Sequence, residues 1–175
     1  MTEHENEKGT GTDAVNEESQ IAEEAEYAVK AVLPNGLLFD YPPSKPPGLL
    51  PPLVLAYIGD AVFEVAIRQY LIGHSNLRPH HLHREATKFV SAGAQARMLF
   101  RIESLLTEEE ADMVRRGRNA KSGSVPKNAD VLEYRHATGL ECLAGYLYYS
   151  GRVGRLEELI RRGLEPDAPQ ESDQE

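Results

Sequence analysis

The sequence predicts an all-α protein, and three observations support that prediction. Apolar residues between positions 53 and 164 recur at the three-to-four-residue spacing of a helix, not the alternation of a strand. Glycines and a capping box mark where helices begin and end. No segment has a convincing strand pattern. We therefore expect one helical bundle, of a size that folds independently.

The first half of the bundle is predicted to consist of two long apolar segments. Residues 53–72 run without proline and are almost entirely apolar. Residues 82–105 are apolar at helical spacing, and the small residues Ser91-Ala92-Gly93 predict a break within them. These segments give helices one to three.

The second half is delimited by local capping signals. Thr107 and Glu110 form a T-x-x-E capping box, which predicts a short helix over 108–116 that Gly117 terminates. Two further helices are expected over 130–150 and 155–162, and each is followed by a glycine, Gly151 and Gly163 respectively.

Charge and proline content divide the 175 residues into four parts. The formal charge is −9, but residues 52–164 carry sixteen bases and thirteen acids, so the body is weakly basic and a nucleic-acid partner stays open. The acids concentrate at the two ends, which are too polar to bury a core. We expect a disordered acidic extension over 1–36, a proline-rich linker over 37–52, the folded domain over 53–164 and an acidic tail over 165–175.

The cysteine content and the lack of long apolar segments predict the cellular setting. Cys142 is the single cysteine, so neither an internal disulfide nor a cysteine-based zinc site is expected. The N-terminal residues are acidic and have no apolar stretch of a secretion signal, and no run of 18 apolar residues occurs. These features predict a cytoplasmic protein without a membrane partner.

Acidic residues interrupt both of the longest apolar helices. Asp60, Glu64 and Arg68 are spaced four apart and share one face of the first helix. An internal ion pair with Arg68 and a metal site are both open interpretations. Glu141 lies among small residues of the last long helix; if the two helices pack side by side, Asp60 and Glu141 could face each other and bind Mg²⁺, which would activate water for attack on a phosphodiester.

A basic segment follows the predicted short helix. Four bases fall within residues 115–121, followed by serine, glycine and asparagine, a composition that suits a sugar-phosphate backbone. It has no aromatic residue for stacking on bases, which favours duplex over single strands. The other interpretation is a solvated helix end whose bases complement the helix dipole. The candidate contacts to RNA are Arg115, Arg116, Arg118, Asn119, Lys121 and Lys127.

Three histidines occur at positions 80, 81 and 83. Their spacing matches no HExxH pattern and no further ligand group lies nearby in sequence, so we do not interpret them as a zinc site. A contact of His83 or Arg84 with a phosphate is the functional alternative that we keep.

The segment Leu55 to Glu64, LAYIGDAVFE, resembles the signature helix of the ribonuclease III catalytic domain. Further motifs in the same order resemble the Mini-ribonuclease III branch of that family, so that the resemblance extends over about residues 53–160. These motifs are HLH at 81–83, FVSA at 89–92, RRGRNAK at 115–121, PKN at 126–128, and the stretch from Tyr134-Arg135 through Glu141 to Gly145-Tyr146-Leu147.

The resemblance implies a homodimeric, Mg²⁺-dependent endoribonuclease that cleaves double-stranded RNA and leaves 5′-phosphate and 3′-hydroxyl ends. Asp60 and Glu141 match the family's catalytic acids, and Glu64 is a further metal candidate. Two other family acids are replaced here by Ala56 and Thr138, so fewer carboxylates hold the metal. The branch implies precursor 23S ribosomal RNA as substrate, with a ribosomal protein or ribosomal precursor particle as a further partner.

Two hypotheses from other classes stay open at the sequence level. The acids lost at positions 56 and 138 are compatible with a non-catalytic module that clamps structured RNA in ribosome biogenesis. The other hypothesis is a helical adaptor that binds protein partners. The endonuclease is favoured because burying carboxylates on apolar helices costs desolvation free energy, and an adaptor has no function that requires them.

Overall fold

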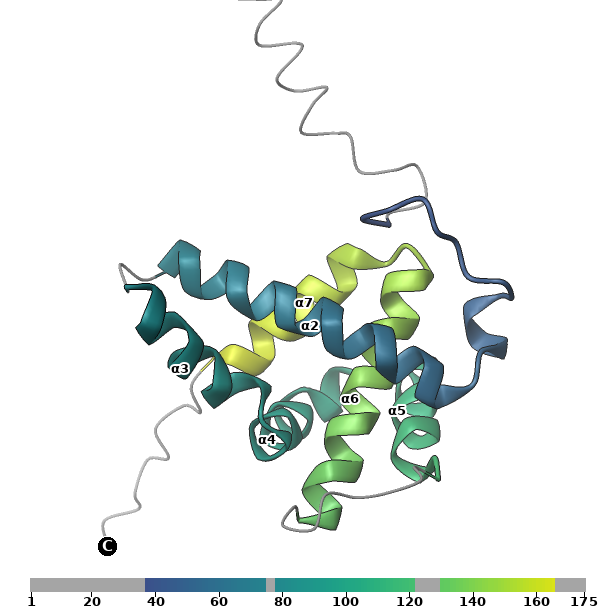
Figure 1. Ribbon diagram of the computed structural model, residues 1–175. Coiled ribbons are helices and arrows are strands. Elements are labelled where there is room, and N and C mark those ends of the chain that lie inside the picture. Colours follow the sequence, from purple (N-terminus) through teal and green to yellow (C-terminus); the bar gives the residue numbers. More distant parts are fainter. Residues whose placement is uncertain (1–36, 75–77, 122–129, 166–175) are drawn as a thin grey trace, which may run out of the picture.

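The computed structural model describes residues 37–74, 78–121 and 130–165, which fold into a bundle of α-helices (Figure 1). Within these ranges no strand occurs, so the all-α prediction is confirmed. The predicted tails over 1–36 and beyond residue 165 lie outside the described residues. The α-helices are α2 (Pro52–His74), α3 (Pro79–Val90), α4 (Ala92–Ile102), α5 (Glu108–Asn119), α6 (Val131–Tyr149) and α7 (Val153–Leu164), and two 3₁₀ turns, η1 (Pro47–Leu49) and η2 (Glu103–Leu105), complete the order.

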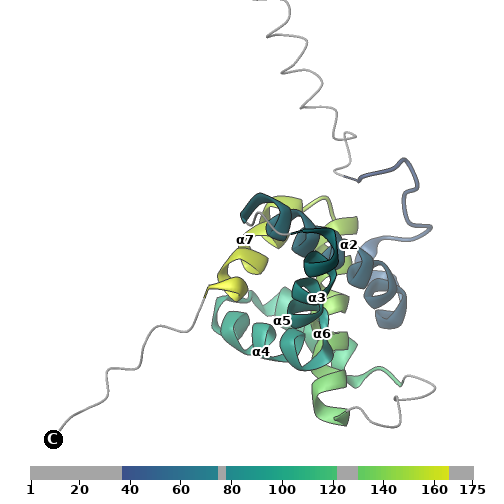
Figure 2. The same cartoon turned by 60° about the vertical axis from the view of Figure 1, so that its left-hand side comes forward.

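Helix α6 is the centre of the bundle. Helices α2, α4, α5 and α7 all pack against it, and α2 crosses it at one side (Figures 1 and 2). Residues 137–140 and 142–148 of α6 are all buried, and Glu141 between them is partly exposed. The largest fully buried side chains include Phe63 and Ile67 of α2 and Leu143 of α6 itself. This arrangement explains why α6 has no polar face: it is covered on nearly every side.

Local sequence signals set several of the helix ends. The Thr107 hydroxyl accepts a hydrogen bond from the Glu110 amide at 3.3 Å, and the Glu110 carboxylate accepts one from the Thr107 amide at 2.9 Å, as the capping box predicts. Ser91 separates α3 from α4, within the predicted break. Gly151 has a φ of 69° and terminates α6, as expected.

Two glycines predicted to end helices do not. Helix α5 continues past Gly117 to Asn119, and α7 includes Gly163. A Cβ atom at Gly117 would lie 2.5 Å from the Cβ of Cys142, and one at Gly163 would lie 2.3 Å from Cγ of Met98. These glycines are therefore required for close helix packing, a role that the local sequence does not distinguish from a helix stop.

Close contact between α2 and α6 places the acidic residues of the two helices. A Cβ atom at Gly59 would lie 1.8 Å from the backbone oxygen of Glu141, and one at Gly145 would lie 2.0 Å from the backbone oxygen of Leu55. Only glycine permits such an approach. Because Gly59 precedes Asp60, the contact brings Asp60 to the level of Glu141.

The proline-rich segment is tied to the body at several points. Leu37 and Leu50 are buried, and the Leu38 amide donates to the Tyr148 hydroxyl at 2.9 Å. Arg116 donates to the backbone oxygens of Gly48 and Leu50 at 2.9 and 3.0 Å. No helix among the described residues is long and apolar enough to cross a membrane.

Candidate active site

Asp60 of α2 and Glu141 of α6 line one open groove of about 540 Å³ between the two helices. The side-by-side packing considered from the sequence is therefore present. Tyr134 and Thr138 of α6 also line the groove. Its remaining lining residues are Leu53, Ala56, Tyr57, Ile58 and Ala61.

The two carboxylates act on each other. Burial, together with the charge of Asp60, raises the pKa of Glu141 to about 7. Burial also raises the pKa of Asp60, and the charge of Glu64 adds to that effect. Among the described residues neither carboxylate forms an ion pair with a base. Two acids held together without a base produce a site of excess negative charge, which a cation would neutralise.

The donor set fits a hard divalent cation that keeps much of its water. Mg²⁺ prefers oxygen ligands and is commonly held by one or two carboxylates together with substrate phosphates. No group of three or more acidic, histidine or cysteine side chains that could hold a metal occurs in residues 37–74, 78–121 and 130–165. A cation bound here would therefore complete its coordination with water and substrate oxygens.

Glu64 is already engaged with a base. Its carboxylate accepts a hydrogen bond from Arg68 at 2.5 Å, so the ion-pair interpretation holds for Glu64 and Arg68, one turn away from Asp60. Glu64 therefore adds negative charge beside Asp60 while its own oxygen is occupied. Asp60 stands outside this pair.

The two positions at which the resemblance noted in the sequence would place further acids hold small, buried residues. Ala56 and Thr138 both line the groove. The Thr138 hydroxyl donates to the backbone oxygen of Tyr134 at 3.0 Å, so it is satisfied within its own helix. Neither residue adds a charge to Asp60 and Glu141.

Gln95 of α4 is the residue near the site that the sequence interpretation did not identify. Its side chain is 1% exposed, and its amide lies close enough to Glu141 to lower the pKa of that carboxyl. A glutamine among the apolar and small residues of α4 is a weak signal in the sequence. Only the packing of α4 on α6 places it beside a carboxylate.

The predicted RNA contacts on α5 fall into two groups. Arg115 pairs with Asp112, and Arg116 holds the proline-rich segment through two backbone oxygens. Arg118, Asn119 and Lys121, at the end of α5, form no ion pair with another described residue. Lys127 lies outside the described residues.

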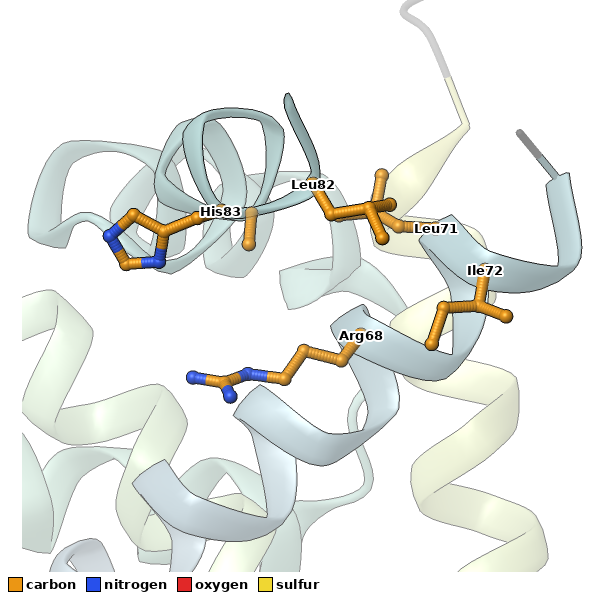
Figure 3. Close-up of a pocket in the computed structure, with 6 residues that line it drawn as sticks. Arg68, Leu71, Ile72, Leu82 and His83 are labelled. Carbon is orange, nitrogen blue, oxygen red and sulfur yellow. The ribbon is translucent and has the colours of Figure 1, made fainter. Parts of the chain in front are cut away.

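The remaining predicted contacts lie on α3, away from the groove. Arg84 is exposed and stands 3.9 Å from Glu85. His83 borders a separate pocket of about 200 Å³ between α2 and α3, where its ring and the Arg68 guanidinium lie on one side and Leu71, Ile72 and Leu82 on the other (Figure 3). This pocket holds none of the groove's carboxylates.

Comparison with known proteins gives a consistent result. The model of the ribonuclease III domain matches residues 53–152. Mini-ribonuclease 3 of Brevibacillus brevis is 48% identical over 121 residues, which cover 69% of this chain and 90% of that protein. Mini-ribonuclease 3 of Enterococcus faecalis is 53% identical over 110 residues, 62% of this chain and 83% of that protein. A crystal structure of a Fusobacterium nucleatum protein aligns with a TM-score of 0.58 at 28% identity, over 63% of this chain and 84% of that one.

Proposed function

The chain belongs to the ribonuclease III family, and on that premise we propose that it cleaves double-stranded RNA at the α2–α6 groove with Mg²⁺ held by Asp60 and Glu141. Family membership makes it an endoribonuclease, and not a non-catalytic RNA clamp or a protein adaptor. The observation that carries the metal proposal is the pair of facing carboxylates without a base.

The roles of the chain's own residues follow from their positions. Asp60 and Glu141 would hold the cation in the open groove, where a substrate phosphate could reach it. A Mg²⁺ ion held by these two carboxylates would supply Lewis-acid polarisation of a phosphodiester and activation of water, the chemistry of a hydrolysis that leaves a 5′-phosphate and a 3′-hydroxyl. Glu64 adds negative charge near the site. Because its carboxylate is paired with Arg68, it is a weaker candidate for a metal ligand than Asp60 and Glu141.

Duplex binding is assigned to the end of α5. Arg118, Asn119 and Lys121 are the candidates whose side chains form no ion pair or hydrogen bond with another described residue, and Lys127 follows them in sequence. Contacts of this kind fix the position of the sugar-phosphate backbone without reading bases, and salt weakens them. His83 and Arg84 on α3 stay secondary candidates.

The outer face of α2 supports a homodimer. Val54, Tyr57, Val65 and Ile72 recur on one stripe of the helix, and Tyr57 and Ile72 are 84% and 66% exposed. A stripe of exposed apolar side chains indicates a protein interface. Tyr57 also lines the groove, so a dimer through this face would place the partner subunit beside each site. Replacing Tyr57 with Glu should yield a monomer in sedimentation equilibrium.

The natural substrate that we propose is precursor 23S ribosomal RNA, cleaved in the cytoplasm at a base-paired stalk, alone or within a ribosomal precursor particle. The resemblance to the Mini-ribonuclease III branch supports this choice. A ribosomal protein bound to the precursor would then act as a further partner.

The decisive experiment follows an end-labelled RNA duplex with Mg²⁺ and with excess chelator. Asp60→Asn and Glu141→Gln should each lose about a hundredfold or more in cleavage rate while duplex binding in a gel-shift assay is retained. Glu157→Gln, an exposed carboxylate on α7, is the control and should cut normally. Cleavage by Asp60→Asn at the wild-type rate, or cleavage in chelator, would contradict the metal site.

A further inference from the structure

Gln95 is a buried polar side chain whose amide donor has no partner among the described residues. In the part of the chain that the structure describes, its Nε2 is the one buried side-chain nitrogen or oxygen atom without a hydrogen-bond partner. Its side chain is 1% exposed, so solvent does not reach it. Burying an amide donor without a partner destabilises the folded state, because its hydrogen bond to water is lost and not replaced. A native protein that keeps such a group requires an explanation.

The side chain of Gln95 lies beside the carboxyl group of Glu141. Helix α4 packs against α6, and the Gln95 amide acts on the carboxyl group of Glu141. The approach is close, yet no acceptor meets the geometry of a hydrogen bond to Nε2. The amide is therefore a donor beside a carboxylate, short of a completed contact.

The chemistry of the neighbourhood restricts what this donor can do. Asp60 faces Glu141 from α2, and Gln95 approaches it from α4. A lysine or arginine at position 95 would neutralise the carboxylate and compete with a cation. A neutral amide can orient the carboxylate and leaves its charge available. Ala56 and Thr138 provide no charged group that could take over this task.

We propose that Gln95 is a positioning residue whose Nε2 donates a hydrogen bond to the Glu141 carboxylate in the working enzyme, holding one oxygen so that the other faces Asp60. The proposal rests on the proposed function, because it assigns Gln95 to the same two-carboxylate site. Partners that orient a metal-binding carboxylate in this way typically change metal affinity or activity by about 10–100-fold when they are lost.

Gln95→Met tests the role because methionine has nearly the same length and shape without a donor. Removing an unpartnered buried amide should leave the free energy of unfolding equal or higher, as followed by urea denaturation. In contrast, we expect the dissociation constant for Mn²⁺, measured by calorimetry on the protein without RNA, to rise about tenfold. The Mg²⁺ concentration for half-maximal cleavage should rise by a similar factor.

Met98→Leu is the matched control, since Met98 is equally buried one turn further along α4 and has no polar group to lose. It should bind Mn²⁺ and cleave RNA as the wild type does. Gln95→Leu serves as a second variant with the same expected result.

The outcomes separate the possibilities. Wild-type Mn²⁺ affinity and cleavage in Gln95→Met would overturn the proposal and leave Gln95 a core residue. Unfolding of both Gln95 variants would also overturn it, because the amide would then be needed for the fold. If the wild-type protein neither binds Mn²⁺ nor requires a divalent cation to cut, the proposed function fails first, independently of Gln95.

Discussion

Replacing Glu141 with Gln should stabilise the protein at the same time as it removes cleavage. In the folded protein, burial and the neighbouring Asp60 raise the pKa of Glu141 from 4.5 to about 7. The native state thus binds this proton more tightly than the unfolded chain does. The stability linked to the group is fully present below pH 4.5 and is lost as pH rises through 7.

The magnitude follows from the two pKa values. A difference of one pKa unit corresponds to about 1.4 kcal/mol, so a rise from 4.5 to about 7 means that ionised Glu141 costs the native state at most about 3.5 kcal/mol above pH 7. Because Glu141 is partly exposed at the groove, we expect the measured value to be about 2 kcal/mol. Glutamine keeps the shape of the side chain and carries no charge at any pH.

The assay is urea denaturation followed by circular dichroism, at matched protein concentration and with chelator, from pH 5 to pH 8. The stability difference between Glu141→Gln and wild type should grow with pH and level off above 7. Addition of Mg²⁺ at pH 8 should restore stability to the wild type alone, since a bound cation favours the ionised folded form. Glu157→Gln, on the exposed side of α7, should show no such trend.

Two results would refute this reasoning. If Glu141→Gln is no more stable than the wild type at pH 8, burial does not penalise the carboxylate. If the gain is the same at pH 5 and pH 8, its origin is packing and not charge. Either result would remove the electrostatic basis of the proposed cation site.

Three further predictions concern the packing and the RNA contacts. Gly59→Ala places a Cβ atom 1.8 Å from the Glu141 backbone oxygen, so α2 and α6 must separate. We expect the free energy of unfolding, measured by urea denaturation, to fall by about 3 kcal/mol. A variant as stable as the wild type would contradict the close packing. Arg155→Met leaves the Glu110 carboxylate, 1% exposed, without its ion-pair partner and should cost about 3–5 kcal/mol. Because Arg155 lowers the pKa of Glu110, that difference should shrink as pH falls below 4.5, which the same titration checks. Alanine at both Arg118 and Lys121 should weaken duplex binding and reduce its salt dependence by about two counterions, measured by filter binding from low to high salt; an unchanged slope would remove them from the interface.

The helices and their ends were largely predictable because their signals are local. The capping box at Thr107 and Glu110, the break at Ser91 and the stop at Gly151 each depend on chemistry within a few residues. Gly117 shows the limit of such signals. It permits contact with Cys142 on another helix, and a sequence does not show which glycine has that role.

The sequence by itself determined the helical class and the presence of isolated carboxylates on two apolar helices, because periodicity and composition are properties of single segments. Only the tertiary structure decided which groups meet. The glycine contact of α2 with α6 brings Asp60 and Glu141 into one groove, and the packing of α4 adds Gln95. The physical reason is that a carboxylate's pKa and partners depend on burial and on charges from other helices, which segments distant in sequence supply.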